Sequence, residues 1–359
     1  MVMLAGILSS CKHYPTAPPH PCDTCKPPCD TCDTTHPPCD TCNIDKDSAA
    51  HAFNWTEYTL SDESSMTGVA VFGPNSIYVF GNNLHIYDGT TWKTTTSVIT
   101  GTSIQVDFID MNVFAFTAND YWVTRGNILL NGDENVVTQY RFTSGPIHSL
   151  NASWGTSSND MFFVGDTGIT VHYDGTTFTK MPRVTTKNLR KVWGTSHNNV
   201  WASGWNQTTG ESVLIHYDGN VWKEIDLSKL GDIGPGSNGL ISVWAIDSAG
   251  HNITVAGGSF VYRTTDNSNW RPDTVGNSLN GGGYVGLNNI RGNSSIDFMV
   301  EGGGGFVTHW NGKTWKLYKE IFDWNSPSFD SYAFSFKGNT ACVVGTKNGT
   351  GWVAIGRRK

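Results

Sequence analysis

Charged residues are scarce in this chain, and the basic ones are not clustered. Only 15% of the 359 residues are charged, and 24 Lys and Arg against 31 Asp and Glu give a net charge of −7. A nucleic-acid groove needs Lys and Arg gathered on one surface. The composition therefore argues against a nucleic-acid partner.

Long apolar runs and catalytic motifs are also missing. No stretch approaches the roughly 20 apolar residues of a transmembrane helix. There is no Gly-x-Ser-x-Gly nucleophile elbow, and the glycine run at residues 302–305 lacks the Lys-Ser/Thr pair of a phosphate-binding loop. The sequence thus predicts no cofactor and contains no recognisable catalytic constellation.

Proline and cysteine are sparse over most of the chain but dense near its start. Residues 12–50 carry eight of the 14 prolines, which predicts an extended, disordered spacer over residues 11–50. A small repeat, Pro-Cys-Asp-Thr-Cys, lies inside it. The repeat gives three Cys-x-x-Cys pairs, which are Cys22 with Cys25, Cys29 with Cys32, and Cys39 with Cys42.

Three interpretations of these six cysteines stay open. Local or intermolecular disulfides suit an exported chain in an oxidising compartment. Four thiolates can instead hold a zinc ion, although these pairs are closer together than in a typical zinc finger and have no core around them. Redox-active thiols are the third possibility. The remaining cysteine of the C-terminal half, Cys342, lies in an apolar strand pattern and is expected to be a buried core thiol.

The first residues form a short apolar segment that ends in Leu8-Ser9-Ser10-Cys11. This tetrapeptide resembles the lipobox of bacterial lipoproteins. The resemblance implies a signal peptide over residues 1–10 and a lipid on Cys11 that anchors the chain in the bacterial cell envelope, for example at the outer membrane. No Lys or Arg precedes the apolar run, which departs from the usual signal peptide.

Residues 51–359 are organised by a repeat whose clearest copy spans residues 189–226. Its patterning predicts four short strands, and Asp218-Gly219 marks a tight hairpin before the last. An aromatic residue near the end of the first strand recurs every 38 to 51 residues, the spacing of propeller blades. This repeat mark is aromatic in six copies and an arginine in the sixth copy. Its positions are Phe72, Phe116, Trp154, Trp193, Trp244, Arg291 and Phe336.

These repeats predict an all-β domain, a seven-bladed β-propeller of four-stranded antiparallel blades. The seventh copy runs out before a clear fourth strand, whereas residues 54–58 look like an isolated fourth strand. We therefore expect the N-terminal strand to complete the last blade and close the ring. Two stacked β-sandwiches or an open solenoid are the alternatives.

The copy from Trp154 to Phe178, with its Trp-Gly-Thr-Ser turn and Tyr-Asp-Gly hairpin, resembles the repeats of uncharacterised bacterial β-propeller lipoproteins. That resemblance implies a fold and a location but no activity. The hairpins are also faintly similar to the Asp-box of sialidase-type propellers. The arginine triad and the Tyr-Glu pair that sialidase chemistry requires do not stand out in this sequence.

Four histidines recur at or near the ends of third strands, so they are expected to pack beside the hairpin turns rather than to catalyse a reaction. They are His85, His172, His216 and His309.

The short, stereotyped turns are predicted to lie on one face of the ring and the long, variable segments on the other. We expect a binding surface on this variable face, near the mouth of the channel, and expect its aromatic residues to be exposed. Arg291 either points into the channel toward an anionic ligand or packs its stem and sends its head to solvent. The candidates are Trp205, Asp232, Tyr284, Arg291, Asp323, Trp324 and Phe329.

Three functions are compatible with these features. The favoured one is a lipid-anchored, non-enzymatic propeller that binds a protein or a polysaccharide. The alternatives are a carbohydrate-active hydrolase or lyase with carboxylates at the channel mouth, and an assembly component linked through the cysteine-rich spacer. A buried acidic cluster with raised pKa at the mouth would favour the enzyme, and a mouth of Gly, Asn and aromatic residues would favour binding.

Overall fold

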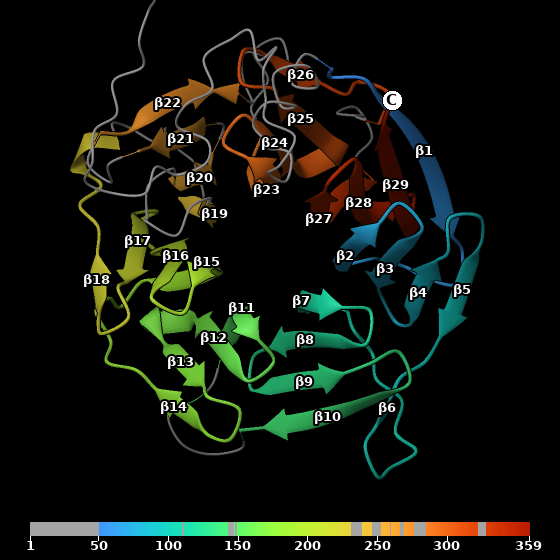
Figure 1. Cartoon of the computed structure of the whole chain (residues 1–359), viewed down its shortest axis with the longest axis horizontal. Helices are drawn as coiled ribbons and strands as arrows, with labels where there is room; N and C mark the ends of the chain where they lie inside the picture. Colours follow the sequence, from blue (N-terminus) through green and yellow to red (C-terminus); the bar gives the residue numbers. More distant parts are fainter. Residues whose placement is uncertain are drawn as a thin grey trace, which may run out of the picture. The chain divides into compact units, whose positions relative to one another are not determined.

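The computed structural model describes residues 50–109, 111–142, 147, 149–230, 239–245, 253–258, 260–265, 269–275, 285–321 and 328–359. From residue 50 onward the chain is one compact unit. Its strands form seven sheets set around a central axis, which confirms the predicted seven-bladed β-propeller (Figure 1).

The predicted leader and spacer lie outside the described residues. The disulfide and metal-site interpretations of the spacer cysteines, and the lipid on the first cysteine, therefore stay predictions. The cysteines concerned are Cys11, Cys22, Cys25, Cys29, Cys32, Cys39 and Cys42.

Each blade runs from an inner strand beside the axis to an outer strand at the rim (Figure 1). From the axis outward, blade 1 consists of β2 (Gly68–Gly73), β3 (Ser76–Phe80), β4 (Leu84–Tyr87) and β5 (Trp92–Thr95), and blade 2 of β7 (Asn112–Thr117), β8 (Asp120–Arg125), β9 (Ile128–Gly132) and β10 (Val136–Arg141). Blade 3 consists of β11 (Leu150–Ser157), β12 (Asp160–Gly165), β13 (Thr170–Tyr173) and β14 (Phe178–Lys180). Blade 4 consists of β15 (Asn188–Ser196), β16 (Asn199–Trp205), β17 (Ser212–Tyr217) and β18 (Trp222–Glu224).

The strands of blades 5 to 7 are β19 (Leu240–Ala245), β20 (Ile253–Gly257), β21 (Phe260–Thr264) and β22 (Arg271–Thr274); β23 (Leu287–Ser294), β24 (Asp297–Gly302), β25 (Phe306–Trp310) and β26 (Trp315–Leu317); and β27 (Phe329–Lys337), β28 (Thr340–Lys347), β29 (Thr350–Arg358) and β1 (Phe53–Leu60). A short parallel strand, β6 (Val98–Ile99), extends blade 2 beyond β10.

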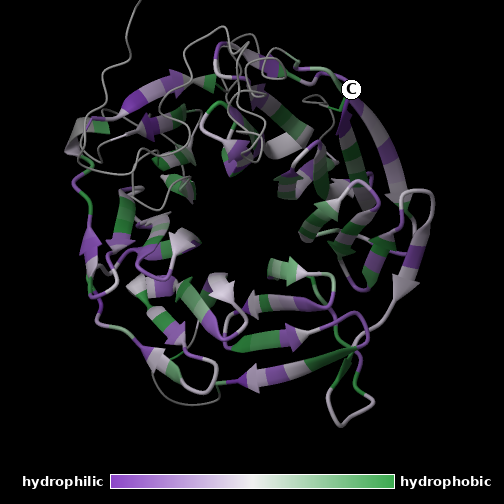
Figure 2. Ribbon diagram, in the orientation of Figure 1, coloured by the Kyte–Doolittle hydropathy of each residue, from purple (hydrophilic) through white to green (hydrophobic). Residues whose placement is uncertain are grey.

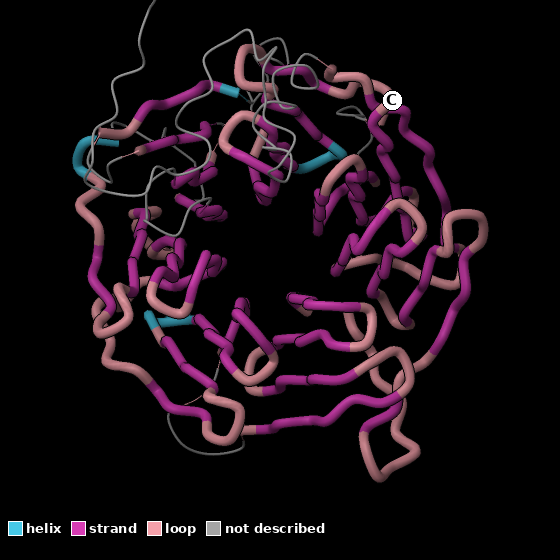
Figure 3. Tube along the Cα trace, in the orientation of Figure 1, coloured by secondary structure: helices cyan, strands magenta, loops and turns pink. Residues whose placement is uncertain are grey.

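Helix is almost absent from the described residues. It comprises the single 3-10 turns η1 (Asp166–Gly168), η2 (Ser228–Leu230) and η3 (Gly303–Gly305), with one further helical residue described at Val275 (Figure 3). No helix in this part of the chain has the length and apolar character needed to cross a membrane.

The ring is closed by strands from the two ends of the propeller. Strand β1 pairs antiparallel with β29, from Phe53 opposite Arg358 to Leu60 opposite Gly351. The outer strand of blade 7 therefore comes from the N-terminal side, as the isolated strand pattern predicted. Closure leaves no inner strand without a neighbouring blade.

The middle strands carry the core because blades pack face to face. Nearly every residue of β12, β16 and β28 is buried, including Cys342, which is the buried thiol that its apolar context predicted. The outer strands β14 and β18 instead expose charged side chains. Figure 2 shows the same gradient from apolar middle strands to a more hydrophilic rim.

The recurring Tyr-Asp-Gly hairpin is explained by its local bonds. In blade 3 the Tyr173 hydroxyl donates to the carbonyl of Gly175 at 2.8 Å, and the Asp174 carboxylate accepts the amides of Thr176 and Thr177. Gly175 has φ of +92°, a conformation that favours glycine. The same tyrosine bond occurs at Tyr87 and Tyr217.

The register of the inner strands corrects the predicted repeat mark in three blades. Trp154 lies opposite Phe162, and its equivalent in blade 2 is Phe114 opposite Trp122, not Phe116. A β-bulge adds a residue to one strand only, so spacing along the sequence does not define the register. The corresponding residues of blades 1 and 7 are Ala70 and Ser335, one or two residues before the predicted Phe72 and Phe336.

Candidate functional site: the central channel

The two ends of the strands form two chemically different faces of the ring. In blade 4 the hairpin residue Gly219 lies so close to the first turn that an added Cβ would fall 2.6 Å from Oδ1 of Asn198. Blade 3 has the same arrangement at Gly175 and Asn159. The stereotyped turns of these two blades thus share one face, as predicted, and the longer described connection between β16 and β17 joins the opposite ends of its strands.

A cavity of about 630 Å³ occupies the centre of the ring between the inner strands. Its wall includes residues of β2, β7, β11, β15, β23 and β27. This volume is in the range of about 300 to 1,000 Å³ that ligand-binding pockets occupy. The channel is therefore the candidate functional site of the described chain.

One side of the channel wall is aromatic and carries a stacked arginine. The rings of Phe114 and Trp193 meet edge to face with centroids 6.2 Å apart. Trp193 is held in place because its indole Nε1 donates to the carbonyl of Ala245 at 3.1 Å. The guanidinium of Arg291 lies over Trp193, 4.3 Å from the ring centroid, and donates to the carbonyl of Ile290. Arg291 therefore lines the channel, the first of the two placements that the sequence left open.

A second cation, Lys191, lines the same channel from β15. Burial in the wall, together with the charge of Arg291, lowers the pKa of Lys191 to about 8. Burial lowers the pKa of Arg291 to about 10. Both side chains are mainly cationic at pH 7, and neither forms an ion pair with another described residue. This part of the channel is therefore positively charged.

The acidic group beside these cations is neutral at pH 7. Glu301 on β24 is completely buried, and burial raises its pKa to about 8. Asn289 Nδ2 donates to its Oε2 at 2.7 Å, and the Ser331 hydroxyl donates to its Oε1. Because both carboxyl oxygens have partners and none of the side chain is exposed, Glu301 does not form the accessible acidic cluster that an enzyme would need.

Two further predicted site residues are described, and they lie away from the channel. Trp205 ends β16 half-buried under the guanidinium of Arg190, which is 5.0 Å from its ring centroid. Phe329 was expected to be exposed, and this was wrong: it is 5% exposed and packs 4.6 Å from Trp352. Strand β27 turns Phe329 inward against β29. The candidates that lie outside the described residues are Asp232, Tyr284, Asp323 and Trp324.

Sequence reasoning missed Lys191 and Trp193 in the channel wall and the buried Glu301 behind it. Two local signals could have drawn attention to them. Lys191 interrupts an inner strand between the buried Leu189 and Val192, and Glu301 ends a run of apolar residues in a middle strand. A charged residue in such a strand must face either a partner or a solvated channel.

Three of the four recurring histidines contact the first residue of the second strand of their blade, in agreement with their predicted packing role, whereas His85 contacts Glu63. His216 also stacks on Trp201 with ring centroids 4.0 Å apart. Burial lowers the pKa of His216 to about 4, so this imidazole is neutral at pH 7. The contacts are His172 to Asp160 at 2.7 Å, His216 to Asn199 at 2.8 Å and His309 to Asp297 at 2.8 Å.

No family model matches the chain, and no curated protein is similar to it. Among solved structures it is similar to YCF48 bound to D1 peptide, with 14% identity, a TM-score of 0.61, and coverage of 85% of this chain and 97% of that one. It is also similar to the WD40 propeller domain of Doa1, with 10% identity, a TM-score of 0.58, and coverage of 85% and 96%.

A third likeness is to the extracellular domain of a putative hybrid two-component system from B. thetaiotaomicron. The identity is 10% and the TM-score 0.58, over 84% of this chain and 39% of that chain. Identities this low establish the fold alone. The chain is a seven-bladed β-propeller with a cationic, aromatic channel.

Proposed function

We propose that this propeller is a binding protein that takes a carboxylate-bearing protein segment into its central channel. The observation that carries the proposal is the pair Lys191 and Arg291, two channel cations without an ion-pair partner among the described residues. Partly buried cations of this kind gain from a ligand that supplies the missing negative charge. The stacked Trp193 orients the guanidinium and adds apolar contact area.

The structural neighbours support a protein ligand, but they do not indicate which protein it is. YCF48 was solved with a peptide, which is a precedent for a propeller of this shape that binds a protein segment. A neutral polysaccharide ligand would draw on the aromatic residues alone. It would leave the charges of Lys191 and Arg291 unused, so we favour the protein segment.

A carbohydrate-active enzyme is supported less well. Glycoside hydrolysis uses two carboxyl groups across a cleft. The described residues that line the channel include no Asp or Glu, and the oxygens of the nearby buried Glu301 are already occupied by Asn289 and Ser331. We therefore propose a non-enzymatic role.

We further propose that the propeller works in the bacterial cell envelope, anchored through a lipid on Cys11 and held away from the membrane by the spacer. The support is the lipobox resemblance of residues 8–11 and the proline content of residues 12–50. Labelling of cells with a fatty-acid analogue should mark the full chain and not its Cys11→Ala variant. Equal labelling of both chains would remove the anchor from the proposal.

The channel proposal predicts a charge-dependent interaction. The full chain should retain fluorescent peptides of mixed Gly, Ser and Leu sequence with one Glu at least about 10-fold better than twins with Gln in its place. Arg291→Gln and Lys191→Gln should each weaken the Glu peptides by about 10-fold or more, because loss of a buried charge partner typically costs 2 to 5 kcal/mol. Fluorescence anisotropy measures both effects.

The same interaction should depend on pH. Lys191 loses its proton as the pH rises through about 8, and Glu301 becomes negative over the same range, so affinity for Glu peptides should fall between pH 7 and 9. Arg183→Gln, at an exposed loop position, is the control and should bind as the wild type does. Equal binding of Glu and Gln peptides, or equal effects of Arg291→Gln and Arg183→Gln, would contradict the proposal.

A further inference from the structure

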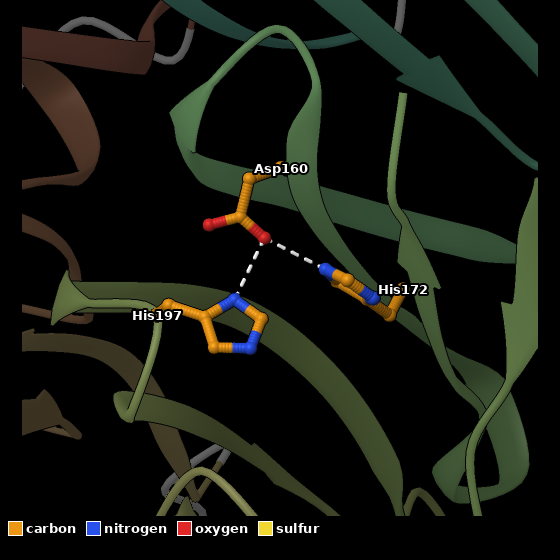
Figure 4. Close-up of side chains that lie close together, drawn as sticks. All are labelled: Asp160, His172 and His197. Carbon is orange, nitrogen blue, oxygen red and sulfur yellow. Dashed lines mark hydrogen bonds and ion pairs between the residues drawn. The ribbon is translucent and has the colours of Figure 1, made fainter. Parts of the chain in front are cut away.

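The carboxylate of Asp160 contacts the imidazoles of two histidines from different blades (Figure 4). His172 Nε2, on β13 of the same blade, lies 2.7 Å from Asp160 Oδ1. His197 Nδ1, in the turn between β15 and β16 of blade 4, lies 2.8 Å from the same oxygen. The three ligand atoms all lie within 4.8 Å of one another. The cluster thus brings one carboxylate and two imidazole nitrogens together at the boundary of blades 3 and 4.

The equivalent aspartates of other blades have different partners. In blade 2, Asp120 accepts from Asn131 Nδ2 at 3.2 Å and from the hydroxyl of Ser158. In blade 6, Asp297 is paired with the guanidinium of Arg358 as well as with one imidazole. An amide, a hydroxyl or a guanidinium can only donate hydrogen bonds to a carboxylate here, whereas a neutral imidazole can also bind a metal ion.

Neighbouring side chains hold Asp160, His172 and His197 in position and leave them accessible to solvent. Phe162 packs against both imidazoles, with centroid distances of 4.7 Å to His172 and 5.5 Å to His197. Thr156 donates to the other carboxylate oxygen, Oδ2. The side chains of Asp160, His172 and His197 are 19%, 21% and 47% exposed, so an ion and a water ligand can reach them.

The protonation state of Asp160 suits a metal ligand. Burial opposes its ionisation, but hydrogen bonds from Thr156, His172 and His197 outweigh this and lower the pKa of Asp160. No Lys or Arg of the described chain forms an ion pair with it. The carboxylate is therefore anionic at neutral pH and has no competing fixed cation.

We propose that Asp160, His172 and His197 form a binding site for a divalent transition-metal ion such as Zn²⁺. Zinc binds imidazole nitrogen and carboxylate oxygen at about 2.0 to 2.2 Å, which places tetrahedral ligands about 3.3 Å apart. The present contacts need only a small expansion, and each neutral imidazole would carry its proton on the ring nitrogen that faces away from the ion, leaving the nitrogen beside Asp160 free to bind it. The ion would join blades 3 and 4 and keep a coordination position open to solvent. This site is separate from the channel and does not depend on the function proposed for it.

The test is zinc binding to the full chain after alkylation of its accessible thiols, so that the six spacer cysteines cannot act as ligands. Isothermal titration calorimetry should show binding that the double variant His172→Asn with His197→Ser lacks. This variant recreates the Asp120, Asn131 and Ser158 arrangement that the propeller already tolerates in blade 2. Its affinity at the site should fall by at least about 100-fold, since loss of one outer-shell partner alone costs about 10- to 100-fold.

Two controls keep the outcome interpretable. His216→Asn changes the third-strand histidine of blade 4, which faces Asn199 rather than a carboxylate, and should bind zinc as the wild type does. Zinc should raise the melting temperature of the wild type and of His216→Asn but not that of the double variant. If wild type and double variant bind the same number of zinc ions with the same affinity, the proposal is wrong and the cluster is a hydrogen-bonded clamp between blades.

Discussion

A chain that begins at Asp62, and so lacks only β1 from the propeller, is expected to lose its cooperative thermal unfolding transition. Strand β1 supplies the outer strand of blade 7 over eight paired residues and buries Phe53 and Leu60. Loss of a single buried Phe side chain costs about 3 to 5 kcal/mol, and whole domains are stable by only about 5 to 15 kcal/mol. Removal of the strand therefore removes an amount comparable to the whole stability.

The same deletion turns β29 into an exposed edge strand. Its backbone loses an entire hydrogen-bonded neighbour, and the indole of Trp352 loses Glu57, to which it donates at 2.6 Å. An unpaired apolar edge of this kind promotes aggregation. A chain that begins at Ala50 is the control and should melt as the full chain does. If both shortened chains show the same melting temperature by circular dichroism, β1 does not close the ring as described.

Replacement of Glu63 by Ala should be the most destabilising single substitution in the closing segment, residues 53–67, which contains β1 and leads into β2. Its completely buried carboxylate accepts the amides of Asn82 and Asn83 at 2.6 and 2.8 Å and lies 2.9 Å from Nε2 of the buried His85. Each orphaned buried donor costs about 1 to 3 kcal/mol, and this change removes the acceptor of both backbone amides. We expect a loss of at least about 3 kcal/mol in the free energy of unfolding.

Denaturant unfolding of three variants would test this order. Glu63→Ala should be least stable, Glu63→Gln intermediate because one acceptor oxygen remains, and Asp62→Ala close to the wild type. Asp62 is the matched control, since its carboxylate is exposed and its contact to Thr94 is long, at 3.5 Å. Unfolding free energies for Glu63→Ala and Asp62→Ala within about 0.5 kcal/mol of each other would show that Glu63 does not anchor the segment.

The structure moves the expected binding surface from the variable loops to the central channel. The sequence directed attention to the variable loops, and four of its seven candidates fall in segments outside the described residues. The described residues instead place three cations, Lys191, Arg291 and Lys337, and an aromatic wall in the channel itself, with Arg291 as the one predicted residue among them.

The sequence by itself determined the architecture, because the signals for it are local and repeated. Alternating apolar residues, Asp-Gly hairpins and a near-constant spacing specify strands and turns within one blade. Ring closure could also be predicted, since the surplus strand around Trp55 matched the strand missing after Trp352. Similar local chemistry in successive copies made each weak signal strong.

Only the tertiary structure decided the chemistry of the channel. Lys191, Arg291 and Glu301 lie on β15, β23 and β24, and β-bulges determine which residues of the inner strands face inward. The pKa of Lys191, for example, follows from burial and from the charges of Arg291 and Glu301, which lie 100 and 110 residues further along the chain. The meeting of His172 and His197 at Asp160 likewise requires two blades to pack together. Such contacts depend on distances in space, which local sequence patterns do not encode.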